Sequence, residues 1–84
     1  MASYKVSFRR SAEKELRKIP KPDLRRVVER IGALSNNPRP SGAQMLKGEN
    51  RYYRVRQGDY RVIYEVDDSA WRVIIIKVGH RREI

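Results

Sequence analysis

The segment Tyr53–Tyr64, which reads Y-R-V-R-Q-G-D-Y-R-V-I-Y, places arginines at a spacing that could bind an anion. Gly58-Asp59 is typical of a two-residue hairpin turn, and such a turn would pair Arg56 directly with Arg61. Like charges at opposite positions of two paired strands destabilise a hairpin. We therefore expect an anion, such as a phosphate group, to lie between these two guanidinium groups.

Alternation along the strands predicts which face the arginines share. Val55 and Val62 would point to one face of the hairpin, and Arg54, Arg56 and Arg61 to the other. Arginine is rarely buried without a partner, so the arginine face should be the one that no helix covers. The alternative is that arginines on an exposed strand only maintain solubility and prevent aggregation. Three on one face, in a chain of net charge +10, favour the anion site.

Composition limits the classes of function. The chain has 84 residues, which predicts a single domain over residues 1–84. It contains no cysteine and only one histidine, so we predict no disulfide, no metal site and no cofactor. Twenty basic residues against ten acidic ones favour a polyanion or an acidic protein as partner. No apolar run is long enough for a membrane span, and we expect a cytoplasmic protein.

The hydrophobic pattern predicts one strand, two helices and then further strands. Residues 4–8 alternate as a strand, residues 10–19 and about 22–34 have helical spacing, and Pro20 and Pro22 separate the two helices. A connection follows, with strands expected at residues 44–46, 52–57, 60–66 and 71–78. This order predicts an α+β domain, in which a helical hairpin packs on one face of a mainly antiparallel sheet of four or five strands.

The last predicted strand has the most apolar run of the chain, Val73-Ile74-Ile75-Ile76. A continuous apolar run predicts burial on both faces and hence a central place in the sheet. We expect Gly79 to end this strand. Trp71 and Phe8 lie in strand patterns that predict burial, which argues against a module that binds RNA by stacking bases on exposed aromatic rings.

Several motifs occur in an order that resembles a known family. They are A-E-K-E-L-R-K-I, N-P-R-P, L-K-G, the hairpin segment and V-G-H-R-R-E-I. This set resembles the RelE/ParE superfamily of bacterial and archaeal toxins, most closely its RelE branch. The resemblance implies a metal-independent endoribonuclease that enters the 70S ribosome and cleaves mRNA in the A site. The 2′-hydroxyl of the mRNA would attack the adjacent phosphate and translation would stop.

The resemblance also implies partners and an alternative. A flexible RelB-like antitoxin would wrap the toxin, and promoter DNA would be bound only through the toxin–antitoxin complex. The alternative is a toxin similar to the ParE branch, which is not a nuclease and inhibits DNA gyrase. A simple RNA-binding module is a third reading, which the five tyrosines keep open.

The resemblance assigns the site to basic residues of the hairpin and of the closing segment. Catalytic roles are predicted for Arg56, Arg61 and Arg81. Binding of RNA phosphates is predicted for Lys47, Arg54 and Arg82.

His80 is the candidate for proton transfer, because histidine has an unperturbed pKa near neutrality. Its alternative is a surface histidine beside Arg81. Many relatives carry a tyrosine just beyond the H-R-R-E-I segment, and we expect weaker catalysis in a chain that lacks it.

Overall fold

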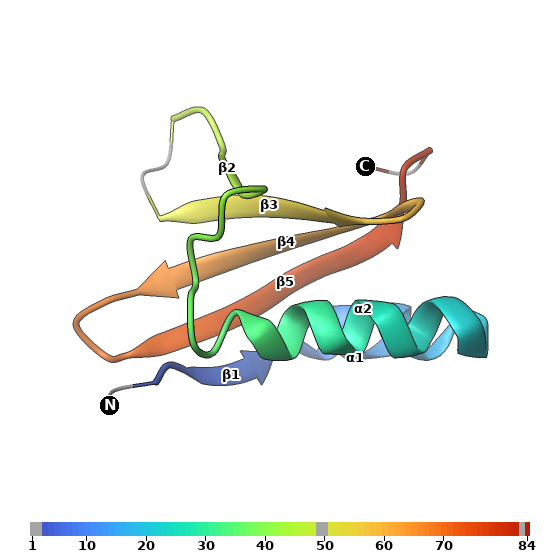
Figure 1. The fold of residues 1–84 in the computed structure, drawn as a ribbon, viewed down its shortest axis with the longest axis horizontal. Helices are drawn as coiled ribbons and strands as arrows, with labels where there is room; N and C mark the ends of the chain where they lie inside the picture. The colour runs from blue at the N-terminus through green and yellow to red at the C-terminus, as the bar shows by residue number, and fades with distance from the viewer. Residues whose placement is uncertain (1–2, 49–50, 83) are drawn as a thin grey trace.

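The computed structural model describes residues 3–48, 51–82 and 84 of the chain. Within them the elements are β1 (Lys5–Phe8), α1 (Arg10–Arg17), α2 (Lys21–Ala33), β2 (Gln44–Met45), β3 (Tyr52–Gln57), β4 (Tyr60–Asp67) and β5 (Arg72–His80) (Figure 1). In the described part of the chain, neither helix has the length and apolar character needed to cross a bilayer. Glu83 of the closing motif lies outside the described residues.

The strands form one sheet in the order β1-β5-β4-β3-β2. β1 and β5 run parallel, and the other neighbouring strands are antiparallel. A parallel pair needs a long crossover connection, and α1 and α2 lie within that connection. Figure 1 shows the two helices lying together against the sheet. The predicted α+β fold, with the N-terminal strand and helical hairpin on one face of a mainly antiparallel sheet, is confirmed.

The hydrophobic core lies between the helices and one face of the sheet. Pro22 stands in the first turn of α2, where the missing N–H of proline costs no hydrogen bond. Ala12 of α1 and Val27 and Ile31 of α2 face inward and are buried. Ile19 and Leu34, which follow the two helices, are buried as well. Three strands supply the other core residues, namely Val55, Val62, Tyr64, Val66, Val73, Ile75 and Val78.

The segment between α2 and β2 is tied to the sheet by polar contacts. The buried Tyr64 hydroxyl donates to the backbone carbonyl of Pro38 at 2.7 Å. Arg39 donates to both carboxylate oxygens of Asp68, at 2.7 and 3.2 Å, and to the hydroxyl of Tyr53 at 2.9 Å. These bonds fix the connection across β3, β4 and the turn after β4.

β5 differs from the prediction in two respects. It continues through Gly79 to His80, because its pairing with β4 extends that far, so the expected break at Gly79 is wrong. The strand is central, between β1 and β4, as predicted. However, Ile74 and Ile76 are only half-buried, so the expected burial on both faces is also wrong. The reason is that both helices pack on the opposite face.

A β-bulge in β5 interrupts the alternation of its side chains. Tyr64 of β4 pairs with Ile75, whereas its neighbour Ile63 pairs with Lys77. One step along β4, from Tyr64 to Ile63, therefore corresponds to two steps along β5, from Ile75 to Lys77. Ile76 is the extra residue of this bulge.

The bulge reverses the faces of the residues that follow it. Val73 and Ile75 face the core before the bulge, and Val78 faces it afterwards. Lys77 consequently lies on the uncovered face and His80 on the helix-covered face. Simple alternation from Val73 would have placed both residues on the opposite faces.

The expected burial of the two largest aromatic residues is wrong. Trp71 is 50% exposed and Phe8 is 39% exposed. Trp71 does not belong to β5 but precedes it in the turn, with a φ of 52°. Its ring contacts that of Tyr4, with 5.0 Å between the ring centroids. Trp71 is exposed because it lies in this turn, beyond the end of the covered face.

Candidate active site

Three arginines lie together on the uncovered face of the sheet. Gly58 takes a φ of 59° at the first central position of the β3–β4 turn, a conformation that glycine adopts readily. This turn sets a register in which Arg56 pairs with Arg61, while Arg54 pairs with Ile63. The predicted register is confirmed. The buried Val55 and Val62 also confirm that the arginines point away from the helices.

The three arginines of the hairpin differ in their neighbours and in their exposure. Gly79 of β5, which carries no side chain and is buried, lies opposite Arg61. Arg61 is half-buried and Arg56 is exposed. Arg54 donates a hydrogen bond of 2.7 Å to the side-chain oxygen of Gln44 on β2, and this bond holds its guanidinium group beside the sheet.

Arg81 reaches the same region from the end of β5. Its backbone N–H donates to the carbonyl of Asp59 at 2.7 Å, which holds the closing segment against the β3–β4 turn. Its Nε atom lies 3.8 Å from Oδ1 of Asp59. Figure 1 shows the segment after β5 beside this turn. We call Arg54, Arg56, Arg61 and Arg81 the arginine cluster.

Arg61 lies close enough to the other three arginines of the cluster for their charges to act on it. Partial burial lowers the pKa of Arg61, and the nearby charges of Arg56, Arg54 and Arg81 lower it further. Asp59 acts in the opposite direction. Since arginine stays protonated at physiological pH, the cluster remains a concentration of positive charge. A bound polyanion would relieve this repulsion, and phosphate suits the fork-shaped geometry of guanidinium groups.

Two further predicted phosphate ligands lie outside the cluster. Lys47 is exposed and follows β2, beside the end of β3 that is remote from the β3–β4 turn. Arg82 is exposed and lies next to Arg81 in the closing segment. The structure therefore places Arg82 near the cluster and Lys47 at the margin of the same region.

His80 is separated from the arginine cluster by the sheet. It pairs with Tyr60 on the helix-covered face, and the two rings meet edge to face with 5.6 Å between centroids. Its Nδ1 atom accepts a hydrogen bond of 3.3 Å from the backbone N–H of Arg82. The β-bulge explains the separation, because it moves His80 away from the uncovered face.

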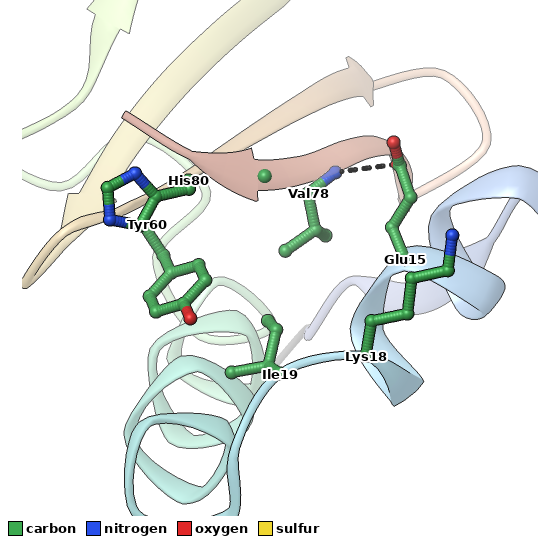
Figure 2. Close-up of a pocket in the computed structure, with 7 residues that line it drawn as sticks. Glu15, Lys18, Ile19, Tyr60, Val78 and His80 are labelled. Atoms are coloured by element: carbon green, nitrogen blue, oxygen red, sulfur yellow. Dashed lines mark hydrogen bonds between the residues drawn. The ribbon is translucent and has the colours of Figure 1, made fainter. Parts of the chain in front are cut away.

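A cavity of about 220 Å³ lies on the His80 side of the sheet (Figure 2). In Figure 2, Tyr60 and His80 stand on one side of it, and Glu15 of α1 and Lys18, which follows that helix, on the other. Oε1 of Glu15 accepts a hydrogen bond of 3.1 Å from the backbone N–H of Val78. This cavity is distinct from the arginine cluster, which lies on an open surface.

Lys77 is a basic residue of the uncovered face that sequence reasoning missed. It pairs with Ile63, whose other neighbour across the sheet is Arg54. Lys77 lies two positions before Gly79, which is opposite Arg61. A pattern of alternating residues could not reveal it, because the bulge that turns Lys77 to this face has no local signature in the sequence.

Comparison with known sequences connects this site to a family. The family model described as "ParE toxin of type II toxin-antitoxin system, parDE" matches residues 6–84. Toxin RelG of Mycobacterium tuberculosis is 35% identical over 82 residues, which cover 96% of this chain and 94% of RelG. The putative toxin RelE1 of Methanocaldococcus jannaschii is 38% identical over 85 residues, covering 95% of this chain and 91% of its own length.

Solved structures agree with the sequence relatives. The toxin–antitoxin complex RelBE2 of Mycobacterium tuberculosis contains a chain with a TM-score of 0.83 and 36% identity, covering 96% of this chain and 94% of that one. The archaeal RelE–RelB complex of Pyrococcus horikoshii OT3 gives a TM-score of 0.83 at 32% identity, with 96% and 98% covered. This chain is therefore a RelE-family toxin of a toxin–antitoxin system, and it belongs to the RelE branch of the RelE/ParE superfamily.

Proposed function

We propose that this toxin is a ribosome-dependent endoribonuclease that cleaves mRNA in the A site and thereby inhibits translation. The observation that supports this proposal best is the arginine cluster on the uncovered face, around the β3–β4 turn. Four guanidinium groups on one open surface match the charge of an RNA backbone. The relatives named RelE and RelG favour the same class of toxin.

The proposed reaction uses the RNA itself as nucleophile. The 2′-hydroxyl oxygen forms a bond to the adjacent phosphorus, the bond from phosphorus to the 5′-oxygen breaks, and a 2′,3′-cyclic phosphate remains. Negative charge accumulates on the phosphate oxygens in the transition state. Preorganised cations that point at this charge lower the barrier, and Arg56, Arg61 and Arg81 are proposed for this role. Arg54, held by Gln44, binds a neighbouring phosphate.

Outlying basic residues would extend the contact along the RNA. Arg82 follows Arg81 and Lys47 lies at the margin of the uncovered face, so both suit contacts with phosphates that flank the cleaved bond. Such contacts contribute affinity and register without reading sequence. The cluster lies on an open surface and not in a cavity, so it cannot by itself bend RNA into the geometry for attack. The ribosome is proposed to supply that geometry, which implies action in the cytoplasm.

An antitoxin is the proposed protein partner. The relatives of known structure include a RelBE2 toxin–antitoxin complex and an archaeal RelE–RelB complex. A chain with net charge +10 suits a flexible acidic partner that folds as it binds. We propose a RelB-like antitoxin that wraps this toxin, and contact with promoter DNA only through that complex.

A translation extract programmed with a defined mRNA tests the proposal. The chain is added and new 5′ ends are mapped, in parallel with Arg61→Ala and Arg81→Ala. Cuts confined to A-site codons, dependent on ribosomes and lost in both variants, are the expected result. Lys5→Ala is a matched control, because Lys5 is exposed on β1 at the remote edge of the sheet.

The same preparation tests the alternative function. The matching family model describes ParE toxins, and the ParE branch is expected to inhibit DNA gyrase. A gyrase supercoiling assay with the purified chain is therefore run beside the translation extract. Intact mRNA together with inhibited gyrase would reject the endoribonuclease proposal in favour of the ParE-like one.

A further inference from the structure

The arginine cluster provides charge but no evident proton donor. Cleavage leaves a 5′-oxygen that must gain a proton, and a positioned acid accelerates this step. Arginine stays protonated in proteins and is a poor donor for this purpose. His80 lies on the other face of the sheet, against Tyr60. Another group on the uncovered face is needed.

The β-bulge places an amine on that face. Ile76 is the extra residue of β5, so Lys77 points away from the helices, in a row with Ile63 and Arg54 across the sheet. Residues diagonal to one another on adjacent strands are within reach of long side chains. Lys77 of β5 is diagonal to Arg61 of β4, which faces Gly79.

The ammonium group of Lys77 is not engaged elsewhere. In the part of the chain that the structure describes, no hydrogen bond or ion pair holds this side chain. The side chain is half-buried, so part of its stem lies on the sheet surface while its end can meet a ligand.

Other titratable groups of the uncovered face are less suited. Tyr52 and Glu65 are directly opposite each other on β3 and β4. Their pair lies four residues along the strands from the pair formed by Arg56 and Arg61. At about 3.3 Å per residue, that is roughly 13 Å away. Glu65 is moreover engaged with Arg51, whose Nε lies 3.6 Å from its carboxylate.

We propose that Lys77 is a catalytic residue of this toxin and protonates the leaving 5′-oxygen. The inference rests on the proposed endoribonuclease function. As the bond from phosphorus to the 5′-oxygen breaks, a proton passes from Nζ of Lys77 to that oxygen. The 2′-hydroxyl loses its proton to water, and the neutral amine of Lys77 regains one from solvent. The arginine cluster stabilises the phosphate throughout and exchanges no proton.

The test measures single-turnover cleavage of mRNA on ribosomes by the wild type, Lys77→Met and Lys77→Arg. Loss of a general acid slows catalysis by about 100-fold or more, and both variants should show this loss. Lys77→Arg keeps the charge but cannot readily give up a proton. Lys5→Met is the matched control, a lysine of the same sheet face on the remote edge strand. Binding of an uncleavable 2′-deoxy mRNA checks that each variant still folds and associates.

A second substrate isolates the proton transfer. In an mRNA whose leaving 5′-oxygen is replaced by sulfur, the leaving group needs no proton. Lys77→Met and Lys77→Arg should cleave this substrate nearly as fast as the wild type does. A wild-type rate for Lys77→Arg on the normal mRNA would overturn the proposal, as would an undiminished defect of both variants on the sulfur substrate. If the wild type itself leaves mRNA intact, the proposed function fails and not merely the role of Lys77.

Discussion

The helix-covered and uncovered faces of the sheet are built from alternate residues of the same strands, yet their compositions are opposite. On β4, Val62 and Tyr64 point to the covered face and are fully buried. Arg61, which immediately precedes Val62, points to the uncovered face and belongs to the arginine cluster. The covered face contributes stability through removal of apolar surface from water. The uncovered face collects repelling charges that do not stabilise the fold.

This difference indicates that stability and chemistry can be changed separately at adjacent residues. A substitution on the covered face should change the free energy of unfolding and affect cleavage only through folding. A substitution on the uncovered face should change cleavage while the fold persists. Substitutions of Ile75 and Arg61 test this separation, and substitutions of Tyr64 and Asp68 measure what polar contacts add to stability.

Ile75→Ala should produce the largest loss of stability. Ile75 is fully buried on the covered face, and truncation of a buried isoleucine costs about 2–5 kcal/mol because a cavity remains. Ile74→Ala is the matched control, since Ile74 is a half-buried neighbour on the uncovered face. Urea denaturation followed by circular dichroism measures both. Equal losses in the two variants would contradict the separation of the faces.

Arg61→Met should reduce ribosome-dependent cleavage by about 10²–10³-fold, the usual cost of removing one group that stabilises transition-state charge. The free energy of unfolding should stay the same or rise, because the repulsion with Arg56 is removed. Arg72→Met serves as the control, an exposed arginine of β5 outside the cluster. A destabilised Arg61→Met protein with an unchanged cleavage rate would reverse the assignment of the faces.

Tyr64→Phe should destabilise the fold by about 1–3 kcal/mol, because the Pro38 carbonyl loses its buried donor. Burial raises the pKa of Tyr64 from 10.0 to about 12, so the folded state disfavours the ionised phenol. The stabilising contribution should be complete below pH 10.0 and lost as the pH rises toward about 12. Thermal unfolding across this range should show a steeper alkaline decline in the wild type than in Tyr64→Phe. Parallel declines would contradict the role of this hydroxyl.

Asp68→Asn should have the smallest effect. Hydrogen bonds from Arg39 and then from Tyr4 lower the pKa of Asp68 below its ordinary 3.8. The ionised carboxylate therefore stabilises the fold at pH values above 3.8, the ordinary pKa. This stabilisation is lost as the pH falls through the lower pKa that Asp68 has in the folded state. Because the pair is exposed, the change should be slight. Melting temperatures from about pH 5 to about pH 2 should decline less in Asp68→Asn. If the melting temperatures of the wild type and of Asp68→Asn decline equally at low pH, this contact does not contribute to stability.

The β3–β4 hairpin could be predicted from sequence because its signals are local. Gly58-Asp59 specifies a two-residue turn, and the turn fixes the pairing of Arg56 with Arg61. Alternation with Val55 then determines the face. All of this information lies within a few residues of the turn.

The remainder of the site depends on contacts between distant segments. Arg81 reaches the cluster through a backbone bond to Asp59, 22 positions earlier in the chain. The bulge, where β5 has one more residue than β4 over the same length, turns Lys77 to the uncovered face and His80 to the covered face. No residue type near Ile76 indicates that mismatch, so simple alternation along β5 would place both residues on the wrong faces.

The sequence by itself determined the α+β class, the hairpin and the positive charge, because turn chemistry, hydrophobic period and charge act over short stretches of chain. Only the tertiary structure decided which basic groups outside the hairpin lie beside its arginines on the uncovered face. It separated His80 from the arginine cluster and brought Lys77 toward it. The physical reason is that strand pairing, and with it the place of the bulge, is set by the packing of β5 between β1 and β4 against the helices.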